Sequence, residues 1–165
     1  MKSTHRNQVK RSEELSYEEM LDIVRFVLSY YNCDREFTMG YLPGTVLEST
    51  SEVESKMEGR GLKGLIHDEG EREHGSKFAD QFKNGEVRPP AVCVVSPKKE
   101  GPNRFIIAID REVFKRESRL FQMVTIAHEA RHVVEFPRIP THDPKGTTEL
   151  LLLREYFARK FPLGI

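Results

Sequence analysis

A His-Glu-x-x-His sequence at residues 128–132 is the feature that most constrains this chain of 165 residues. Histidines four residues apart lie one turn apart on the same face of a helix. That spacing allows the imidazoles of His128 and His132 to bind one Zn²⁺, and Glu129 can accept a proton from water that the metal activates. The pattern therefore predicts a zinc hydrolase with His128 and His132 as metal ligands and Glu129 as the general base.

The residues around this motif predict a buried helix. Ser118 is a suitable N-cap, and Pro137 ends the helix at or before Phe136. Apolar residues recur at roughly helical spacing between these limits, at Leu120, Met123, Ile126, Ala127, Ala130, Val133 and Val134. Because unpaired polar groups are costly to bury, a metal would explain why two histidines and a glutamate lie on such a helix. The alternative is that both histidines are ordinary side chains of an amphipathic helix.

Arg131 is the unusual residue of the motif, because zinc peptidases usually have an uncharged residue there. We expect its guanidinium at the edge of the site, or its stem extended toward solvent. In the first case Arg131 is also a candidate to stabilise the transition state, as are Tyr156 and His142.

A third ligand is needed, since a catalytic zinc usually has three protein ligands and one open position. A second helix is expected at 147–161, beginning with a Thr cap after Gly146. Glu149 and Glu155 lie six residues apart on it, so only one of them can face the metal. Glu155 is preferred because we expect its flanking residues to face the core. Glu149 already has a structural explanation, since the helix dipole favours a carboxylate in the first turn. Glu149 and His142 stay alternative ligands.

Three segments together resemble the ImmA/IrrE-type metallopeptidases. They are RFIIAI at 104–109, FQMVTIAHEARH at 121–132 and EYFARKFPL at 155–163. That family has a strand, a helix of the form F-x-x-A-H-E-x-x-H, and a second helix whose first Glu is the third zinc ligand. The resemblance implies a zincin-like fold with Glu155 as that ligand. It also implies a peptidase that cleaves a regulatory protein of the repressor type.

The expected fold class is α+β, in one domain spanning 1–165 with a frayed, polar segment at 1–14. Ser16 to Glu19 form a capping box that opens a helix ending near Tyr31, with Tyr30 and Tyr31 more often core than substrate contacts at that spacing. Apolar, β-branched runs at 91–96 and 104–109 predict an antiparallel hairpin, with Cys93 in the core. We therefore expect a small antiparallel sheet packed by helices.

The stretch 38–88 is punctuated by glycines, and we expect helices only at 46–57 and 76–82. The charged run HDEGEREH at 67–74 indicates a solvated loop, with a second metal site as the alternative.

Composition narrows the choice of partners. The 26 basic and 26 acidic residues balance, so a generally basic surface for nucleic acid is not indicated. Two cysteines form no disulfide framework. The polar N-terminus and the lack of a long apolar run predict a cytoplasmic protein.

The expected partner is a protein or peptide substrate, held extended along an edge of the sheet. The alternatives are a zinc hydrolase of a non-peptide bond and a non-enzymatic, metal-containing module that binds a protein.

Overall fold

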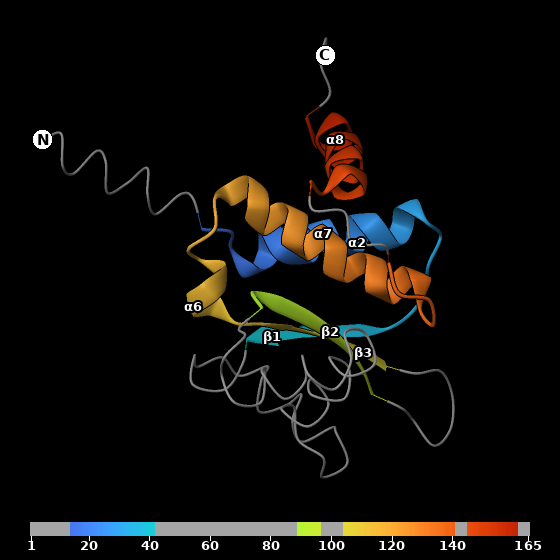
Figure 1. The fold of residues 1–165 in the computed structure, drawn as a ribbon. Coiled ribbons are helices and arrows are strands. Elements are labelled where there is room, and N and C mark those ends of the chain that lie inside the picture. The colour runs from blue at the N-terminus through green and yellow to red at the C-terminus, as the bar shows by residue number, and fades with distance from the viewer. Residues whose placement is uncertain (1–13, 42–88, 97–103, 141–144, 162–165) are drawn as a thin grey trace, which may run out of the picture.

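The structure of this chain is a computed structural model that describes residues 14–41, 89–96, 104–140 and 145–161 (Figure 1). The elements, in chain order, are α2 (Tyr17–Tyr30), β1 (Phe37–Tyr41), β2 (Ala91–Ser96), β3 (Arg104–Ile109), α6 (Arg111–Phe114), α7 (Arg119–Glu135) and α8 (Thr147–Lys160). This is the predicted mixture of helices with a small sheet.

Within the described ranges, the sheet is three-stranded, in the order β1-β3-β2. Strands β2 and β3 pair antiparallel, with Val94 opposite Ile106, so the predicted hairpin is confirmed. Strand β1 was not predicted, and it pairs parallel to β3 with Met39 opposite Ile107. The expectation of a purely antiparallel sheet is therefore wrong, because the short segment at 37–41 joins the far side of β3 and makes the sheet mixed. The central strand is buried from Phe105 to Ile109, as expected for a strand with neighbours on both sides.

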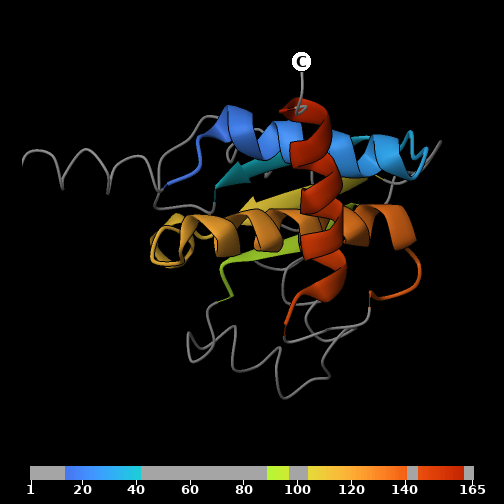
Figure 2. The ribbon, with the colours of Figure 1, turned by 90° about the horizontal axis from the view of Figure 1, so that it is seen from above.

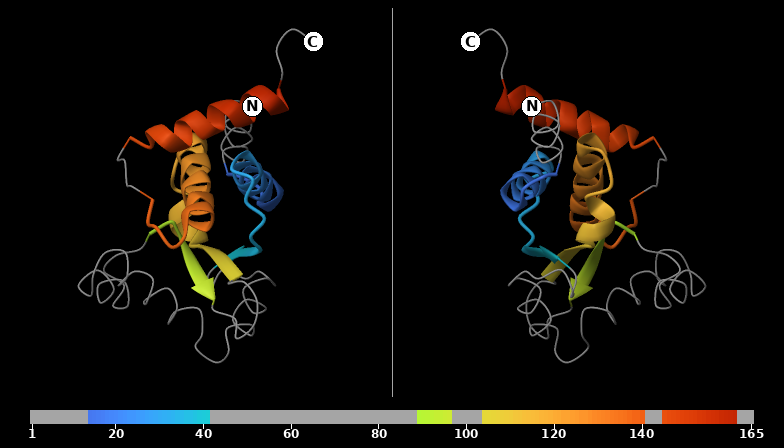
Figure 3. Two further views of the ribbon diagram at one scale, coloured as in Figure 1. Left: turned by 90° about the vertical axis from the view of Figure 1, so that its right-hand side faces the viewer. Right: turned by 90° about the vertical axis from the view of Figure 1, so that its left-hand side faces the viewer.

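The helices form two layers on one face of the sheet. Helices α2 and α7 lie side by side over the strands, and α8 crosses both of them on the side away from the sheet (Figures 1 and 3). Figure 2 shows the crossing from above. Helix α7 is consequently covered by the sheet, by α2 and by α8. This explains why polar residues in its second half are buried.

Capping signals predicted the start of two helices correctly. The Ser16 hydroxyl accepts a hydrogen bond from the Glu19 amide while the Glu19 side chain accepts one from the Ser16 amide, which is the predicted capping box. Ser118 caps α7 in the same way, by accepting from the Phe121 amide.

The start of α8 differs from the prediction. Its N-cap is Gly146 in the left-handed region at φ 63°, and Thr147 is the first helical residue instead of the cap. A Cβ at Gly146 would lie 3.0 Å from Cγ1 of Val124, so glycine also permits the close approach of α8 to α7.

Helix α2 has a buried apolar stripe that does not extend to its end. Met20, Ile23, Val24 and Val27 are buried, as is Cys93 in β2. Tyr30 and Tyr31 were expected to be core residues, but they are 41% and 43% exposed. Tyr31 lies beyond the last helical residue and is followed by Asn32 at φ 53°, so the helical phase of the stripe stops before it.

A buried amide joins the segment before α2 to α7. The Gln122 side chain is fully buried, its Oε1 accepts from the Leu15 amide at 2.8 Å, and its Nε2 donates to the Glu117 carbonyl at 3.0 Å. Both ends of the amide are thus satisfied, which offsets the cost of its burial.

Arg35 holds the other end of α7. Its guanidinium donates to the carbonyl oxygens of Val133 at 2.7 Å and Phe136 at 2.9 Å, and it lies over the ring of Phe105 in β3. A cation suits this position, because the last carbonyls of a helix lack partners within the helix.

Several predictions fall outside the described residues: the helices at 46–57 and 76–82, the charged run at 67–74, His142, and nearly all of the segment 1–14. In the parts that the structure describes, no helix is long and apolar enough to cross a membrane.

Replacing Arg35 with Met should lower the free energy of unfolding by about 1.5–3 kcal/mol, because hydrogen bonds from a charged donor to partly buried carbonyls are lost. Urea denaturation measures the change. Arg25 is an exposed arginine on α2, and Arg25→Met should change stability by no more than about 0.5 kcal/mol. Equal losses in the two variants would contradict the role given to Arg35.

Replacing Glu117 with Gln should stabilise the protein at neutral pH. Burial raises the pKa of Glu117 above its usual 4.5, although a hydrogen bond from Thr125 opposes the shift. The folded state therefore favours the protonated carboxyl of Glu117. The resulting stabilisation is fully present below pH 4.5 and is lost as the pH rises through the folded-state pKa. Thermal unfolding at a series of pH values should show the advantage of Glu117→Gln at pH 7 disappearing in acid. A constant advantage at every pH would be the contrary result.

Candidate metal centre

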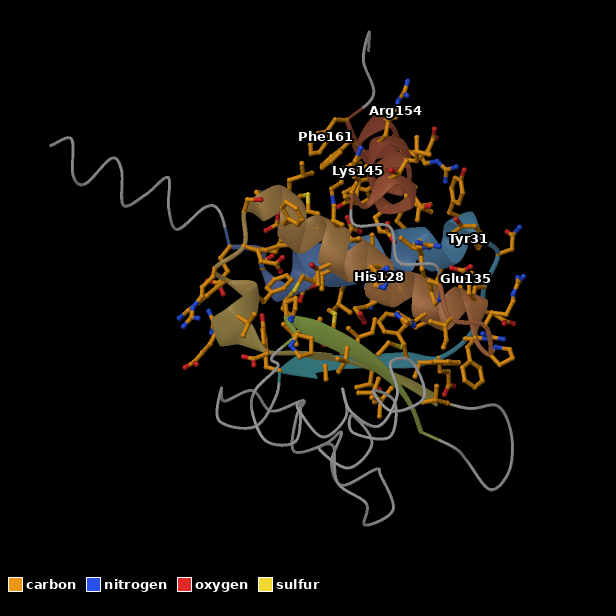
Figure 4. The ribbon with its side chains drawn as sticks, viewed as in Figure 1. Tyr31, His128, Glu135, Lys145, Arg154 and Phe161 are labelled. Carbon is orange, nitrogen blue, oxygen red and sulfur yellow. The ribbon has the colours of Figure 1, made fainter. Side chains whose placement is uncertain are left out.

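Helix α7 brings the three residues of the motif together. The potential ligand atoms of His128, Glu129 and His132 all lie within 4.8 Å of one another. The two imidazole rings are 4.9 Å apart and nearly perpendicular, at 87°. This follows from the helix itself, since residues four apart are stacked on one face. Figure 4 shows His128 midway along α7.

The group is largely buried. Glu129 is 5% exposed and His132 is 7% exposed, while Nε2 of His128 and Oε2 of Glu129 are both buried from solvent. Two imidazoles and a carboxylate form a donor set that suits Zn²⁺ and related divalent metals. The residues therefore fit a metal ion, although the donor set alone does not distinguish zinc from its neighbours.

Glu149, on α8, extends the group to a second helix. Its Oε1 lies 2.9 Å from Nδ1 of His128. In neutral histidine, a carboxylate at Nδ1 requires the proton on that nitrogen, so Nε2 keeps its lone pair. Glu149 therefore faces the side of the ring opposite to the nitrogen that a metal would use.

The helical phase of α8 explains the position of Glu149. Its buried residues are Glu149, Leu152, Leu153 and Tyr156, a stripe with intervals of three, one and three residues. The carboxylate thus lies at the start of the apolar face that packs on the rest of the protein.

Glu155 lies off this stripe and is exposed. The expectation that its flanks face the core is wrong for Leu151 and Phe161, which are 56% and 64% exposed, although Leu152 and Tyr156 are buried. The structure does not bring Glu155 to the histidines, and within the described ranges the three-residue group includes no residue of α8. This placement gives no support to Glu155 as the third ligand.

Arg131 was expected at the edge of the site or extended to solvent, but it is only 8% exposed. Its NH1 lies 2.5 Å from Oε1 of Glu149, and its Nε and NH2 each lie 3.2 Å from Oε2 of Glu135. Although burial opposes ionisation, hydrogen bonds from His128 and Arg131 lower the pKa of Glu149 to about 2. The cation therefore pairs with a buried carboxylate that is ionised at neutral pH.

Tyr156, another predicted transition-state stabiliser, has a different partner, and His142 lies outside the described residues. Tyr156 is buried and donates to Oδ2 of Asp22 on α2 at 2.7 Å, next to the Lys160–Asp22 ion pair. Burial, together with the neighbouring Asp22, raises the pKa of this phenol. Its hydroxyl thus joins α8 to α2 and is engaged away from the histidines.

Comparison with known proteins adds nothing to this geometry: no family model matches the chain, and neither a curated protein nor a solved structure matches it. These comparisons therefore support neither the resemblance to the ImmA/IrrE-type metallopeptidases nor any function.

In metal-free protein, Glu149→Ala should destabilise the fold far more than Glu155→Ala. The first change leaves a buried arginine without one of its two carboxylates, and breaking a buried ion pair costs about 3–5 kcal/mol. The second removes an exposed side chain and should cost at most about 0.5 kcal/mol. Urea denaturation in the presence of a chelator measures both. A larger loss in Glu155→Ala would contradict the packing of α8 described above.

Proposed function

We propose that this chain is a zinc-dependent metallopeptidase, similar to the ImmA/IrrE type. His128 and His132 would hold the metal, and Glu129 would act as the general base. The observation that carries the proposal is the single group formed by His128, Glu129 and His132, with ligand atoms within 4.8 Å on a helix that is otherwise packed in the core. A histidine pair at this spacing with an adjacent glutamate is the arrangement that binds zinc in metallopeptidases.

When bound, Zn²⁺ would supply the Lewis acidity that makes water a nucleophile and polarises a carbonyl near neutral pH. The carboxylate of Glu129 would take the proton from the attacking water and later deliver it to the departing amine. Glu149 would hold the His128 ring from the opposite side, at Nδ1. Among the described residues, neither Glu149 nor Glu155 belongs to the three-residue group, so the proposal leaves the third ligand to His142 or another residue outside the described ranges.

The substrate is proposed to be a protein or peptide in an extended conformation. Strand β2 forms one end of the three-stranded sheet and packs against α7, which carries the motif. A peptide strand added at that edge would run past α7, with main-chain hydrogen bonds for affinity. A regulatory protein of the repressor type, in the cytoplasm, is the substrate class that the resemblance implies.

One observation favours a second candidate, a non-enzymatic module with a structural metal site. Nε2 of His128 and Oε2 of Glu129 are buried, whereas catalysis requires that a substrate reach the metal. A zinc hydrolase of a non-peptide bond would share the same motif. Activity against peptides, measured together with metal content, separates these candidates.

Glu129→Gln should keep the metal and reduce peptide hydrolysis by about 10²–10⁴-fold, because the amide cannot accept the proton from water. His128→Ala should lose both metal and hydrolysis. Metal content is measured by elemental analysis, and hydrolysis by mass spectrometry of a peptide library. Glu18→Gln, at an exposed glutamate of α2 outside the group, is the control and should retain both. Full hydrolysis by purified Glu129→Gln would exclude Glu129 as the base, and metal binding without hydrolysis in the wild type would favour the structural module.

A further inference from the structure

We infer that Arg131 is a positioning residue for metal binding, and that it acts through Glu149. By holding the Glu149 carboxylate against Nδ1 of His128, it leaves Nε2 as the nitrogen that faces a metal. This inference rests on the proposed metal site. Arg131 occupies one of the two unspecified positions of the His-Glu-x-x-His motif, so the motif itself does not explain its charge.

A single carboxylate oxygen connects the arginine to the histidine. Oε1 of Glu149 lies 2.5 Å from NH1 of Arg131 and 2.9 Å from Nδ1 of His128. The two donors thus converge on one acceptor, and moving the guanidinium would move the oxygen that orients the imidazole. Carboxylates that accept from the second nitrogen of a ligating histidine set its tautomer and ring orientation and raise its basicity as a ligand.

The guanidinium is itself held in place from two directions. Glu135 lies one turn further along α7 and accepts from Nε and NH2, whereas Glu149 approaches from α8. The planar fork of arginine can serve two carboxylates at once, which a lysine ammonium cannot do with the same geometry. Arg131 therefore bridges the helix of the motif to the helix that supplies the orienting carboxylate.

Glu149 depends on this bridge, because its side chain is 3% exposed. An ionised carboxylate at that depth is strongly unfavourable unless a cation or several donors pair with it. Without Arg131, the carboxylate would lose the cation that pairs with it at 2.5 Å, and its position at Nδ1 would no longer be favoured. The orientation of His128 should therefore depend on Arg131 through the carboxylate that both residues contact.

The test measures Zn²⁺ affinity of the full chain by competition with a chromophoric chelator, and the absorption spectrum of the Co²⁺ form, for Arg131→Met and Glu149→Gln. Each variant should weaken Zn²⁺ binding by about 10–100-fold, the usual effect of losing an outer-shell partner. Glu155→Gln is the matched control, since Glu155 lies on the same helix as Glu149 but is exposed; it should change affinity by no more than about twofold.

The double variant Arg131→Met/Glu149→Gln removes both buried charges, and it keeps the test decisive if Arg131→Met alone does not fold. Because Arg131 acts through Glu149, the double variant should bind Zn²⁺ no more weakly than Glu149→Gln. A purely structural role would lower the unfolding temperature of the metal-free protein and leave the affinity and the Co²⁺ spectrum unchanged.

Wild-type affinity in Arg131→Met or in Glu149→Gln would overturn the inference, as would multiplicative losses in the double variant. Failure of the proposed metal site gives a different result, because the wild-type protein would then bind neither Zn²⁺ nor Co²⁺. Failure of peptidase activity alone would leave these metal affinities unchanged.

Discussion

The burial of α7 beneath α8 is the constraint on which the rest of the structure depends. A helix that packs against a sheet, α2 and α8 has few faces left for polar side chains, yet α7 carries Gln122, Glu129, Arg131 and His132 in buried positions. Each of these polar groups needs a hydrogen-bonding partner to offset the cost of its burial. The amide of Gln122 uses backbone groups, and Arg131 uses a carboxylate from another helix. The site is therefore assembled by packing as much as by the motif.

Local signals predicted a large part of the fold. The capping box at Ser16, the cap at Ser118 and the β-branched runs on either side of 97–103 all report interactions between residues close in the chain. Strand β1 escaped prediction although FTMGY alternates in character, because the run is short, contains a glycine and has no turn partner nearby. It gains its hydrogen bonds only by joining β3 more than sixty residues later. Strand pairing of that kind is a tertiary event that a local pattern does not contain.

The site was predicted unevenly for a similar reason. His128, Glu129 and His132 come together because helical geometry alone decides their spacing. The choice between Glu149 and Glu155 depended on the phase of α8, and four successive leucines at 150–153 concealed which face was buried. The sequence is compatible with two apolar faces on this helix. One places Glu149 with Leu152, Leu153 and Tyr156, and it is the buried one; the other includes Glu155. Arg131 could not be explained at all until α8 supplied its partner.

The hydrogen bond between Tyr156 and Asp22 has a mechanical consequence. It fixes α8 to α2 at a point seven residues beyond Glu149, about 10 Å along the same helix at 1.5 Å per residue. A helix of this length behaves as a stiff rod, so a displacement at one end is carried to the other. A shift of α2 would therefore be carried along α8 to the Glu149 carboxylate beside His128. Helix α2 can influence the candidate metal centre in this way, although it contributes no side chain to it within the described residues.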